Sequence, residues 1–381
     1  MYYFYAFSGI IQGQYRDKQE SMKKTFIYLL AMLAVVGSCR REPVPQKKEE
    51  KGERRRLVLR QPSENFQIPC GGKLVFSFAL HDTTHALAID SICCFIHGKK
   101  AGVFNTLDFI CPVAEDEKTG TKKISLEVFF RDGKKEVYQV NGYFLAARQP
   151  RQYGCKVLKT YPHDITSYTQ GLVYHEGCLY ESTGLYRKSK IRKLEYTTGK
   201  VLAERKLEDK YFGEGIAIAN QRLYQITWNE KVGFVYSLDK FEIQQYFNLP
   251  SPEGWGMAFN KTFLLMSDGS YKIYFLDTLT LVPHHTIDVA DHERMITELN
   301  EMEWVDGIIY ANVYQTDVIV MIDENTGQVT GRIDCSGLLS ETDRHPETDV
   351  LNGIAYLPQS KHFLITGKNW PKLFEVIWVK K

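Results

Sequence analysis

Five related segments in the C-terminal part of the chain restrict its fold more than any other feature. Each copy has an apolar strand led by Gly or Glu, a short turn and a second strand. The first strands begin at residues 171, 215, 256, 301 and 353, about 45 residues apart, which is typical of four-stranded propeller blades. The sequence therefore predicts a five-bladed β-propeller over residues 151–381; a sandwich or an open solenoid is the alternative.

The two ends of this repeat region predict how the ring closes. A second hairpin follows each of the first four copies, whereas the fifth copy ends at Phe374–Val379, one hairpin short. The strand-like segment Cys155–Tyr161 precedes the first copy and can supply what is missing. Pairing the two ends protects the sheet edges, so we favour a closed propeller.

Residues 57–150 form a second region of short strand-like runs. Lys73–Leu80 and Val137–Leu145 are two of them, and Asp132-Gly133 is a strong hairpin signal between strand patterns. Aromatic residues make up 13% of the chain, which favours strands over helical bundles. We predict a small immunoglobulin-like β-sandwich, which we interpret as a spacer or docking module because it carries no catalytic constellation.

The N-terminal segment, residues 1–39, has the pattern of an export signal. Met22-Lys23-Lys24 is a short basic region, and the apolar run Phe26–Val36 is too short to span a bilayer. The sequence Val-Gly-Ser-Cys ending at Cys39 resembles the lipobox of bacterial lipoproteins. That resemblance implies cleavage before Cys39 and lipidation of its thiol, with translation starting at Met22; a plain secretory signal is the alternative.

Residues 40–56 are rich in charge and contain no aromatic residue, so they cannot bury enough surface to fold. We interpret them as a tether to a membrane. Arg40, rather than Asp, follows the lipidated cysteine, which favours the outer membrane; we expect a monomeric, periplasm-facing lipoprotein of the cell envelope. The net charge of +2 gives no argument for nucleic-acid binding.

Seven cysteines remain besides Cys39, so an oxidising compartment would leave at least one unpaired. Four of them cluster between residues 70 and 111, so a disulfide is plausible there, although the sequence does not give its connectivity. The chain has no Cys-x-x-Cys pair, so a zinc ribbon or a thioredoxin-like motif is not expected.

Polar and aromatic residues stand where the five inner strands are expected to begin. The residues one position before each strand are Gln170, Glu214, Trp255, Asn300 and Asn352. The ends of the second strands add Glu181, Trp228, Asp268, Asn312 and Lys368. Because inner strands converge on the channel of a propeller, we expect these residues to line one mouth of it. Glu214 stands between two glycines, which can present its carboxylate to a cavity.

Ten motifs in this region carry a family resemblance. In chain order they are Tyr168–Leu172, Tyr180–Tyr186, Tyr211–Gly215, Gln225–Trp228, Glu253–Gly256, Met266–Gly269, Leu299–Glu303, Ala311–Asp317, Val350–Ala355 and Thr366–Glu375. Together they resemble the plant- and bacterial-type glutaminyl-peptide cyclotransferases over nearly all of residues 161–379. The resemblance implies a five-bladed propeller that converts N-terminal Gln of peptides and proteins to pyroglutamate with release of ammonia.

The resemblance also implies roles for individual residues. Glu214 would be the general acid/base, Asn300 and Lys368 further catalytic groups, and Gln170 a polar substrate-binding group. The aromatic part of the substrate site would consist of Tyr168, Phe212, Trp228, Trp255 and Tyr314. The family usually has Phe in place of Tyr168 and Trp in place of Tyr314, so both positions keep a ring while the detailed shape of the site changes.

The resemblance implies no required cofactor. The histidines lack metal-ligand spacing, no His-Glu-x-x-His motif occurs, and nothing resembles the metal-dependent cyclases of animals; a structural ion in the channel is left open. The alternative function is a non-catalytic propeller that binds peptides or cell-envelope partners. The joint presence of Glu214, Asn300, Lys368 and the tryptophans favours the enzyme.

Overall fold

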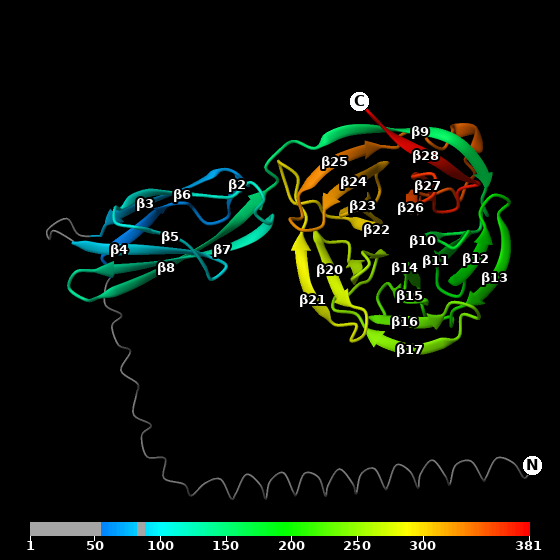
Figure 1. Ribbon diagram of the computed structural model, residues 1–381, viewed down its shortest axis with the longest axis horizontal. Helices are drawn as coiled ribbons and strands as arrows, with labels where there is room; N and C mark the ends of the chain where they lie inside the picture. The colour runs from blue at the N-terminus through cyan, green and yellow to red at the C-terminus, as the bar shows by residue number, and fades with distance from the viewer. Residues whose placement is uncertain (1–54, 82–87) are drawn as a thin grey trace, which may run out of the picture. The chain divides into compact units, whose positions relative to one another are not determined.

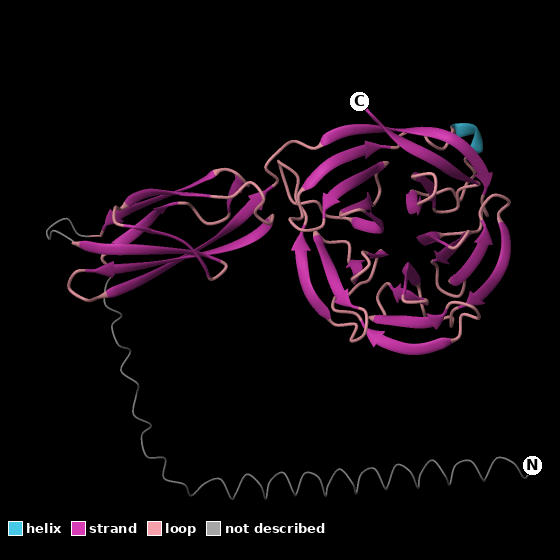
Figure 2. Cartoon of the chain, viewed as in Figure 1, coloured by secondary structure: helices cyan, strands magenta, loops and turns pink. Residues whose placement is uncertain are grey.

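The computed structural model describes residues 55–81 and 88–381, and these residues form almost entirely β-strands and loops (Figure 2). The signal-like segment with Cys39 and nearly all of the predicted tether lie outside the described residues. Within the described ranges, the single helical element is a short 3₁₀ turn, Glu341–Asp343, and no helix there is long and apolar enough to cross a membrane.

Residues 57–145 form the predicted sandwich from two sheets. One sheet has the order β1-β3-β6, with bounds Leu57–Gln61, Lys73–Leu80 and Asp108–Pro112. The other has the order β2-β8-β7-β4-β5, with bounds Phe66–Pro69, Lys135–Leu145, Gly120–Phe130, Ile89–Ile96 and Lys99–Phe104. Burial alternates along β7 and β8, as expected for strands with one face on a core. That core includes Phe76, Ile92, Leu126 and Phe144, so both sheets contribute to it.

Residues from 151 onward form five four-stranded blades around a common centre (Figure 1), which confirms the predicted propeller. The first blade comprises β10 (Thr169–His175), β11 (Cys178–Thr183), β12 (Lys190–Glu195) and β13 (Lys200–Lys206). The second comprises β14 (Gly213–Ala219), β15 (Arg222–Thr227), β16 (Val232–Ser237) and β17 (Ile243–Asn248). The third comprises β18 (Met257–Phe259), β19 (Phe263–Ser267), β20 (Lys272–Asp277) and β21 (Pro283–Asp288).

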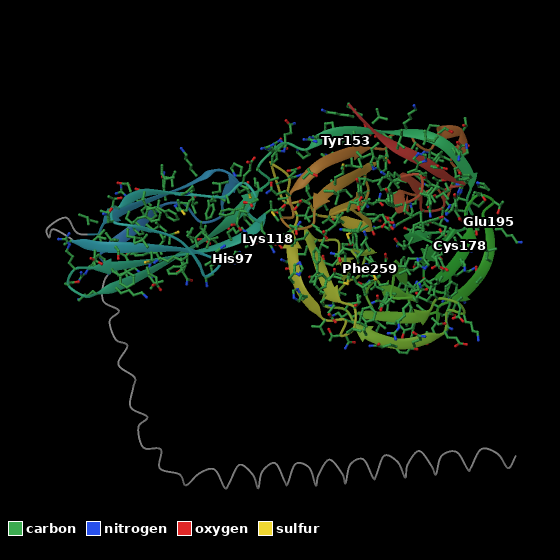
Figure 3. The ribbon with its side chains drawn as sticks, viewed as in Figure 1. His97, Lys118, Tyr153, Cys178, Glu195 and Phe259 are labelled. Atoms are coloured by element: carbon green, nitrogen blue, oxygen red, sulfur yellow. The ribbon has the colours of Figure 1, made fainter. Side chains whose placement is uncertain are left out.

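The fourth and fifth blades share one eight-stranded sheet. The fourth contains β22 (Leu299–Val305), β23 (Ile308–Val313), β24 (Val318–Asp323) and β25 (Val329–Asp334). The fifth contains β26 (Leu351–Leu357), β27 (His362–Gly367), β28 (Lys372–Lys380) and, as its outermost strand, β9 (Arg151–Pro162). Figure 3 labels Tyr153 on this outer strand and Phe259 at the end of the inner strand β18.

Strand β9 closes the ring, as the sequence predicts. It pairs antiparallel with β28, with Tyr161 opposite Leu373, and parallel with β25, with Gly154 opposite Asp334. One detail of the prediction is wrong, because the fifth blade lacks one strand of its own rather than a hairpin. The nine-residue strand β28 already supplies the third position, which leaves only the outermost one for β9.

The inner strands approach one another closely at two glycines. A Cβ atom on Gly215 would lie 2.4 Å from the backbone nitrogen of Met257, and one on Gly256 would lie 2.0 Å from the carbonyl oxygen of Asn300. The Gly215 N–H donates to the Trp255 carbonyl at 2.8 Å, across the boundary between the second and third blades. Glycine is therefore required at these two positions by the proximity of the neighbouring inner strand.

The seven cysteines that the structure describes all carry free thiols, so none of them forms the disulfide that the sequence leaves open. Cys94 on β4 and Cys111 on β6 are both fully buried in the sandwich core. They come from opposite sheets, and the interaction between the two thiols raises the pKa of Cys94.

Candidate active site

Four inner strands break their pairing with the second strand of the blade at the same point, near the start of the strand. The interruptions fall at Gln170, Glu214–Gly215, Asn300–Glu301 and Asn352–Gly353. Such irregularities re-aim side chains out of the regular pleat and are frequent beside active sites. The predicted positions are thus slightly wrong: these residues lie just inside their strands, on the irregular pairs, rather than before them.

A chain of buried side chains forms the floor of the site. Gln170 Nε2 donates to Glu214 Oε1 at 3.1 Å, and Asn352 Nδ2 donates to Gln170 Oε1 at 3.3 Å. Asn352 thereby fixes the amide of Gln170 with its NH₂ group directed at the carboxyl of Glu214. Asn300 is equally buried, and within the described part of the chain its Oδ1 atom has no hydrogen-bond partner. Asn352 Oδ1 also lacks a partner among the described residues, so the floor offers one carboxyl group and two unpartnered amide oxygens.

Aromatic side chains and two charged ones form a closed circuit, which we call the mouth ring. Phe212 contacts Trp228 and Tyr168, with ring centroids 5.5 and 6.4 Å apart, and Trp255 contacts Tyr314 at 5.5 Å. Two further contacts complete the circuit: Glu253 joins Trp228 to Trp255, and Lys368 joins Tyr314 to Tyr168. The residues of the mouth ring come from all five blades. The ring includes each of the five aromatic residues that the sequence predicts for the site.

Lys368 is the cation of the mouth ring. Its Nζ atom lies over the rings of Tyr168 and Tyr314, 4.9 Å from each centroid, and the residue is 3% exposed. Burial lowers the pKa of Lys368, while the negative charges of Glu214 and Asp349 act in the opposite direction. Asp349 also accepts a 2.9 Å hydrogen bond from the Tyr168 hydroxyl. The hydroxyl group of Tyr168 thus connects the mouth ring to Asp349.

Burial raises the pKa of Glu214 well above its ordinary value. The charge of Lys368 opposes this shift, and the charges of Glu230 and Glu253 add to it. A carboxyl group with a raised pKa can both accept and return a proton near neutral pH, which suits general acid/base chemistry.

Not every residue predicted at the mouth reaches this cluster. Glu181 binds the His163 ring at 3.0 Å and the Thr169 hydroxyl at 2.7 Å, and Asp268 accepts hydrogen bonds from Ser251 and Tyr274. Asn312 accepts the Gly353 N–H at 3.2 Å. The oxygen atoms of these three residues are therefore hydrogen-bonded to neighbouring loops and strands.

Three acids at the mouth are not among the predicted site residues: Glu230, Glu253 and Asp349, although Glu253 stands in one of the family motifs. Glu230 accepts a 2.8 Å hydrogen bond from the Tyr186 hydroxyl and a 3.4 Å one from the backbone of Phe212. A signal was present, since Glu230 follows Trp228 by two residues and Glu253 precedes Trp255 by two. An acid that close to each tryptophan is a candidate acceptor for an indole N–H.

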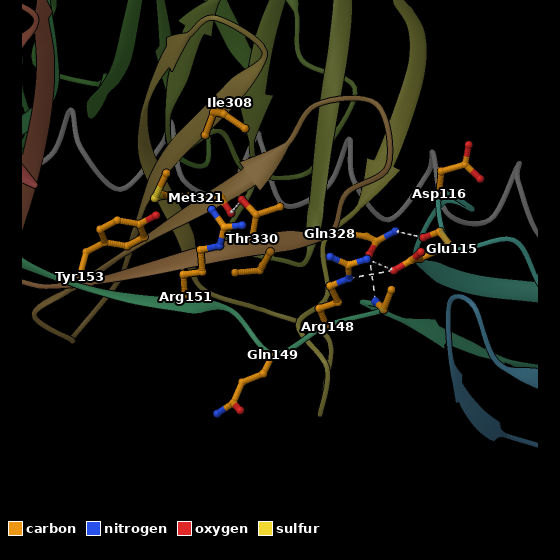
Figure 4. A pocket seen from close by; sticks show the side chains of 12 residues that line it. Glu115, Asp116, Arg148, Gln149, Arg151, Tyr153, Ile308, Met321, Gln328 and Thr330 are labelled. Atoms are coloured by element: carbon orange, nitrogen blue, oxygen red, sulfur yellow. Dashed lines mark hydrogen bonds and ion pairs between the residues drawn. The ribbon is translucent and has the colours of Figure 1, made fainter. Parts of the chain in front are cut away.

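A separate cavity of about 630 Å³ lies beside β9 and β25 (Figure 4). Its wall includes Arg148, Arg151, Tyr153 and Gln328, and Arg148 forms a 2.7 Å ion pair with Glu115. None of the predicted site residues lines it. Its charged groups are paired or exposed, and it offers no nucleophile beside a base, so the mouth ring remains the candidate active site.

Within residues 55–81 and 88–381, no group of three or more His, Cys, Asp or Glu side chains is arranged to hold a metal ion. At the mouth, the carboxylates of Glu230, Glu253 and Asp349 each accept hydrogen bonds from aromatic side chains of the site.

Comparison with known proteins agrees with this geometry. The family described as glutamine cyclotransferase matches residues 134–377. The glutaminyl-peptide cyclotransferase of Arabidopsis thaliana is 37% identical over 228 residues, which is 58% of this chain and 70% of the plant protein. The crystal structure of Myxococcus xanthus glutaminyl cyclase superposes with a TM-score of 0.57 at 32% identity, covering 61% of this chain and all of that one. The match includes every strand of the mouth and leaves out most of the sandwich, and the chain belongs to the glutamine cyclotransferase family.

Proposed function

We propose that the chain converts N-terminal glutaminyl residues of peptides and proteins to pyroglutamate at the floor of the mouth ring. The observation that carries this proposal is the environment of Glu214: a buried carboxyl with a raised pKa, hydrogen-bonded to Gln170, whose neighbouring cation Lys368 lies over the ring of Tyr168. Membership of the glutamine cyclotransferase family supports the same reaction.

The reaction joins two groups of a single residue. The unprotonated α-amine attacks the side-chain amide carbon, a C–N bond forms, and the amide oxygen takes the negative charge. The ordinary pKa of an α-amine is about 8, so its deprotonation costs little near neutral pH. The substrate carries both reacting groups, and the aromatic rings need only fold its side chain over and exclude water.

Glu214 moves the proton. Its carboxylate accepts a proton from the attacking nitrogen and returns one to the departing nitrogen, which leaves as ammonia. Gln170 Nε2 holds the Oε1 atom of Glu214 and leaves Oε2 for the substrate. The returned proton balances the step, since one C–N bond forms, one breaks and no net proton is consumed.

Lys368 and Asn300 are assigned different contacts with the substrate. The ammonium of Lys368 donates to the developing oxyanion, a contribution of typically about 3 kcal/mol. The unpartnered Oδ1 atom of Asn300 suits an N–H of the substrate, either of the amine or of the leaving amide. Trp228, Trp255 and Phe212 surround the aliphatic part of the glutaminyl side chain.

The test is ammonia release from a Gln-initiated dipeptide by the purified protein, with the product peptide weighed by mass spectrometry. We expect stoichiometric ammonia and a product lighter by one ammonia. A folded protein that binds the dipeptide without releasing ammonia would favour the alternative of a non-catalytic peptide-binding propeller.

We also propose that the chain is exported and anchored by lipid at Cys39, as a monomeric lipoprotein of the outer membrane facing the periplasm. The lipobox-like sequence before Cys39 and the Arg that follows it support this location. The mass of the N-terminal peptide from membrane fractions tests it: we expect a diacylglyceryl-modified Cys39, and Cys39→Ser should release the protein from membranes. An unmodified N-terminus beyond a cleaved signal would favour plain secretion.

Sedimentation of the lipid-free protein tests the proposed monomeric state, and we expect the mass of a single chain.

A further inference from the structure

Glu253 occupies an unusual position in the mouth ring. A single oxygen atom, Oε2, accepts the indole N–H of Trp228 at 2.8 Å and the indole N–H of Trp255 at 2.8 Å. Trp228 follows β15 of the second blade, and Trp255 precedes β18 of the third. Each indole has one donor, so this one carboxylate satisfies both tryptophans.

The rest of the mouth ring cannot replace this link. Phe212 packs on Trp228, and Tyr314 packs on Trp255, so each indole has a neighbour on one side. Within the described residues, no contact between aromatic rings joins Trp228 to Trp255 directly. Without Glu253 the circuit would be open at the boundary between the second and third blades, and both indoles would lose the hydrogen bond that fixes their ring orientation.

From this geometry we infer that Glu253 is a positioning residue for the cyclisation, holding two substrate-contacting tryptophans in one orientation. The inference rests on the proposed function. It assigns Glu253 no contact with the reacting atoms. Hydrogen bonds with a charged acceptor are shorter and about twice as strong as neutral ones, so a carboxylate suits this task better than a neutral group.

The negative charge of Glu253 has a second effect that a purely structural residue would lack. The groups that act on Glu214 are Lys368, which favours its ionised form, and Glu230 and Glu253, which disfavour it. Neutralising Glu253 therefore lowers the pKa of Glu214. The acid limb of the activity profile should then move to lower pH.

Two substitutions at Glu253 separate these effects. In Glu253→Gln an amide oxygen can still accept from the indoles, so KM should stay near the wild-type value while the acid limb moves to lower pH. In Glu253→Met no acceptor remains, and the indoles are free to rotate. We expect kcat/KM for a Gln-initiated dipeptide to fall about 10- to 100-fold, as misplaced contacts of this kind do, with a rise in KM.

A matched control exists at Trp304. Its indole N–H donates to Glu324 Oε2 at 3.0 Å, and the same oxygen accepts Asn260 Nδ2 at 2.8 Å, on residues outside the mouth ring. Glu324→Met should change tryptophan emission without changing kcat/KM or the pH profile. Thermal melting of all variants establishes that each is folded.

The outcomes are distinguishable. An active wild type, with Glu253→Met impaired, Glu253→Gln rescued in KM and Glu324→Met unaffected, supports the inference. An active wild type whose folded Glu253→Met variant keeps wild-type kcat and KM overturns the inference and leaves the proposed function standing. An inactive wild type overturns the proposed function, and this inference with it.

Discussion

Glu214 and Glu301 are buried carboxyl groups on the inner strands of the second and fourth blades, and they differ in their hydrogen-bond partners. Both are on irregular pairs of inner strands, both are fully buried, and burial raises the pKa of each well above its ordinary value. Glu301 uses both oxygens for backbone donors: Leu172 N at 3.1 Å and Ile354 N at 2.7 Å. Glu214 has one side-chain donor, Gln170, and a cation nearby.

This difference separates a structural carboxyl from a chemical one. Glu301 ties the first blade to the fifth, since its donors come from β10 and β26. Burial raises the pKa of both residues. The negative charge of Glu303 raises the pKa of Glu301 further, whereas the positive charge of Lys368 acts to lower the pKa of Glu214. A raised pKa alone therefore does not identify the proton carrier; an uncommitted oxygen atom and a cation beside it do.

The largest expected effect comes from exchanging the carboxyl of each residue for an amide. Glu214→Gln should lower kcat about 100- to 10,000-fold, because the amide cannot carry the proton. Glu301→Gln should keep most activity and melt at a lower temperature, because its NH₂ group would face a backbone donor. Steady-state kinetics and thermal melting measure both. Lost activity in a well-folded Glu301→Gln variant, with Glu214→Gln active, would reverse the assignment.

Removing the cation is the next largest change. Lys368→Met should lower kcat about 100- to 1,000-fold through loss of oxyanion stabilisation. It should also move the acid limb of the pH profile upward, because Lys368 is the group that lowers the pKa of Glu214. Lys372→Met is the matched control, since Lys372 forms a 2.6 Å ion pair with Asp343 that is partly exposed. An unchanged pH profile in an active Lys368→Met variant would contradict this coupling.

The dependence of stability on pH is expected to differ between wild type and Glu214→Gln. A raised carboxyl pKa contributes stability that is present below the ordinary pKa of 4.5 and lost as pH rises through the folded-state value. The wild type should therefore lose stability relative to Glu214→Gln as pH rises above the ordinary carboxyl pKa of 4.5. Denaturant unfolding at several pH values measures the difference, and a constant gap across this range would show that the pKa of Glu214 is not raised.

The smallest effect is expected at Tyr168. Tyr168→Phe removes the hydroxyl that donates to Asp349 and keeps the ring under Lys368. One hydrogen bond is worth about 1 kcal/mol, so kcat/KM should change by no more than about fivefold. Tyr168→Ala, which also removes the ring, is the comparison variant. Equal losses in the two variants would mean that the hydroxyl, and not the ring, holds Lys368.

Much of the fold was predictable because a repeated hydrophobic pattern encodes it. Five copies spaced about 45 residues apart predicted five blades, and the spare strand-like segment Cys155–Tyr161 predicted the closure of the ring. The irregular pairs at Gln170, Glu214 and Asn300 were not predictable, since pairing interruptions depend on the neighbouring strand. Their side chains were nevertheless found, through the family motifs.

The role of Glu253 illustrates what sequence reasoning could not reach. Its two partners come from different blades, and the hydrogen bonds exist only once those blades stand side by side. The motif around Trp255 placed Glu253 near the site but gave no reason for an acid there.

The closing strand β9 has a consequence for the order in which the protein folds. Tyr161 pairs with Leu373, so the contact that completes the ring joins parts of the chain more than two hundred residues apart. Contacts of such long sequence separation form slowly, because the intervening chain must first be organised. During synthesis β9 leaves the ribosome before any blade exists, and its antiparallel partner β28 emerges after all other strands of the propeller. The ring therefore closes only after all five blades have emerged, and until then β9 and the unpaired edge of the fifth blade are the surfaces most exposed to wrong pairing.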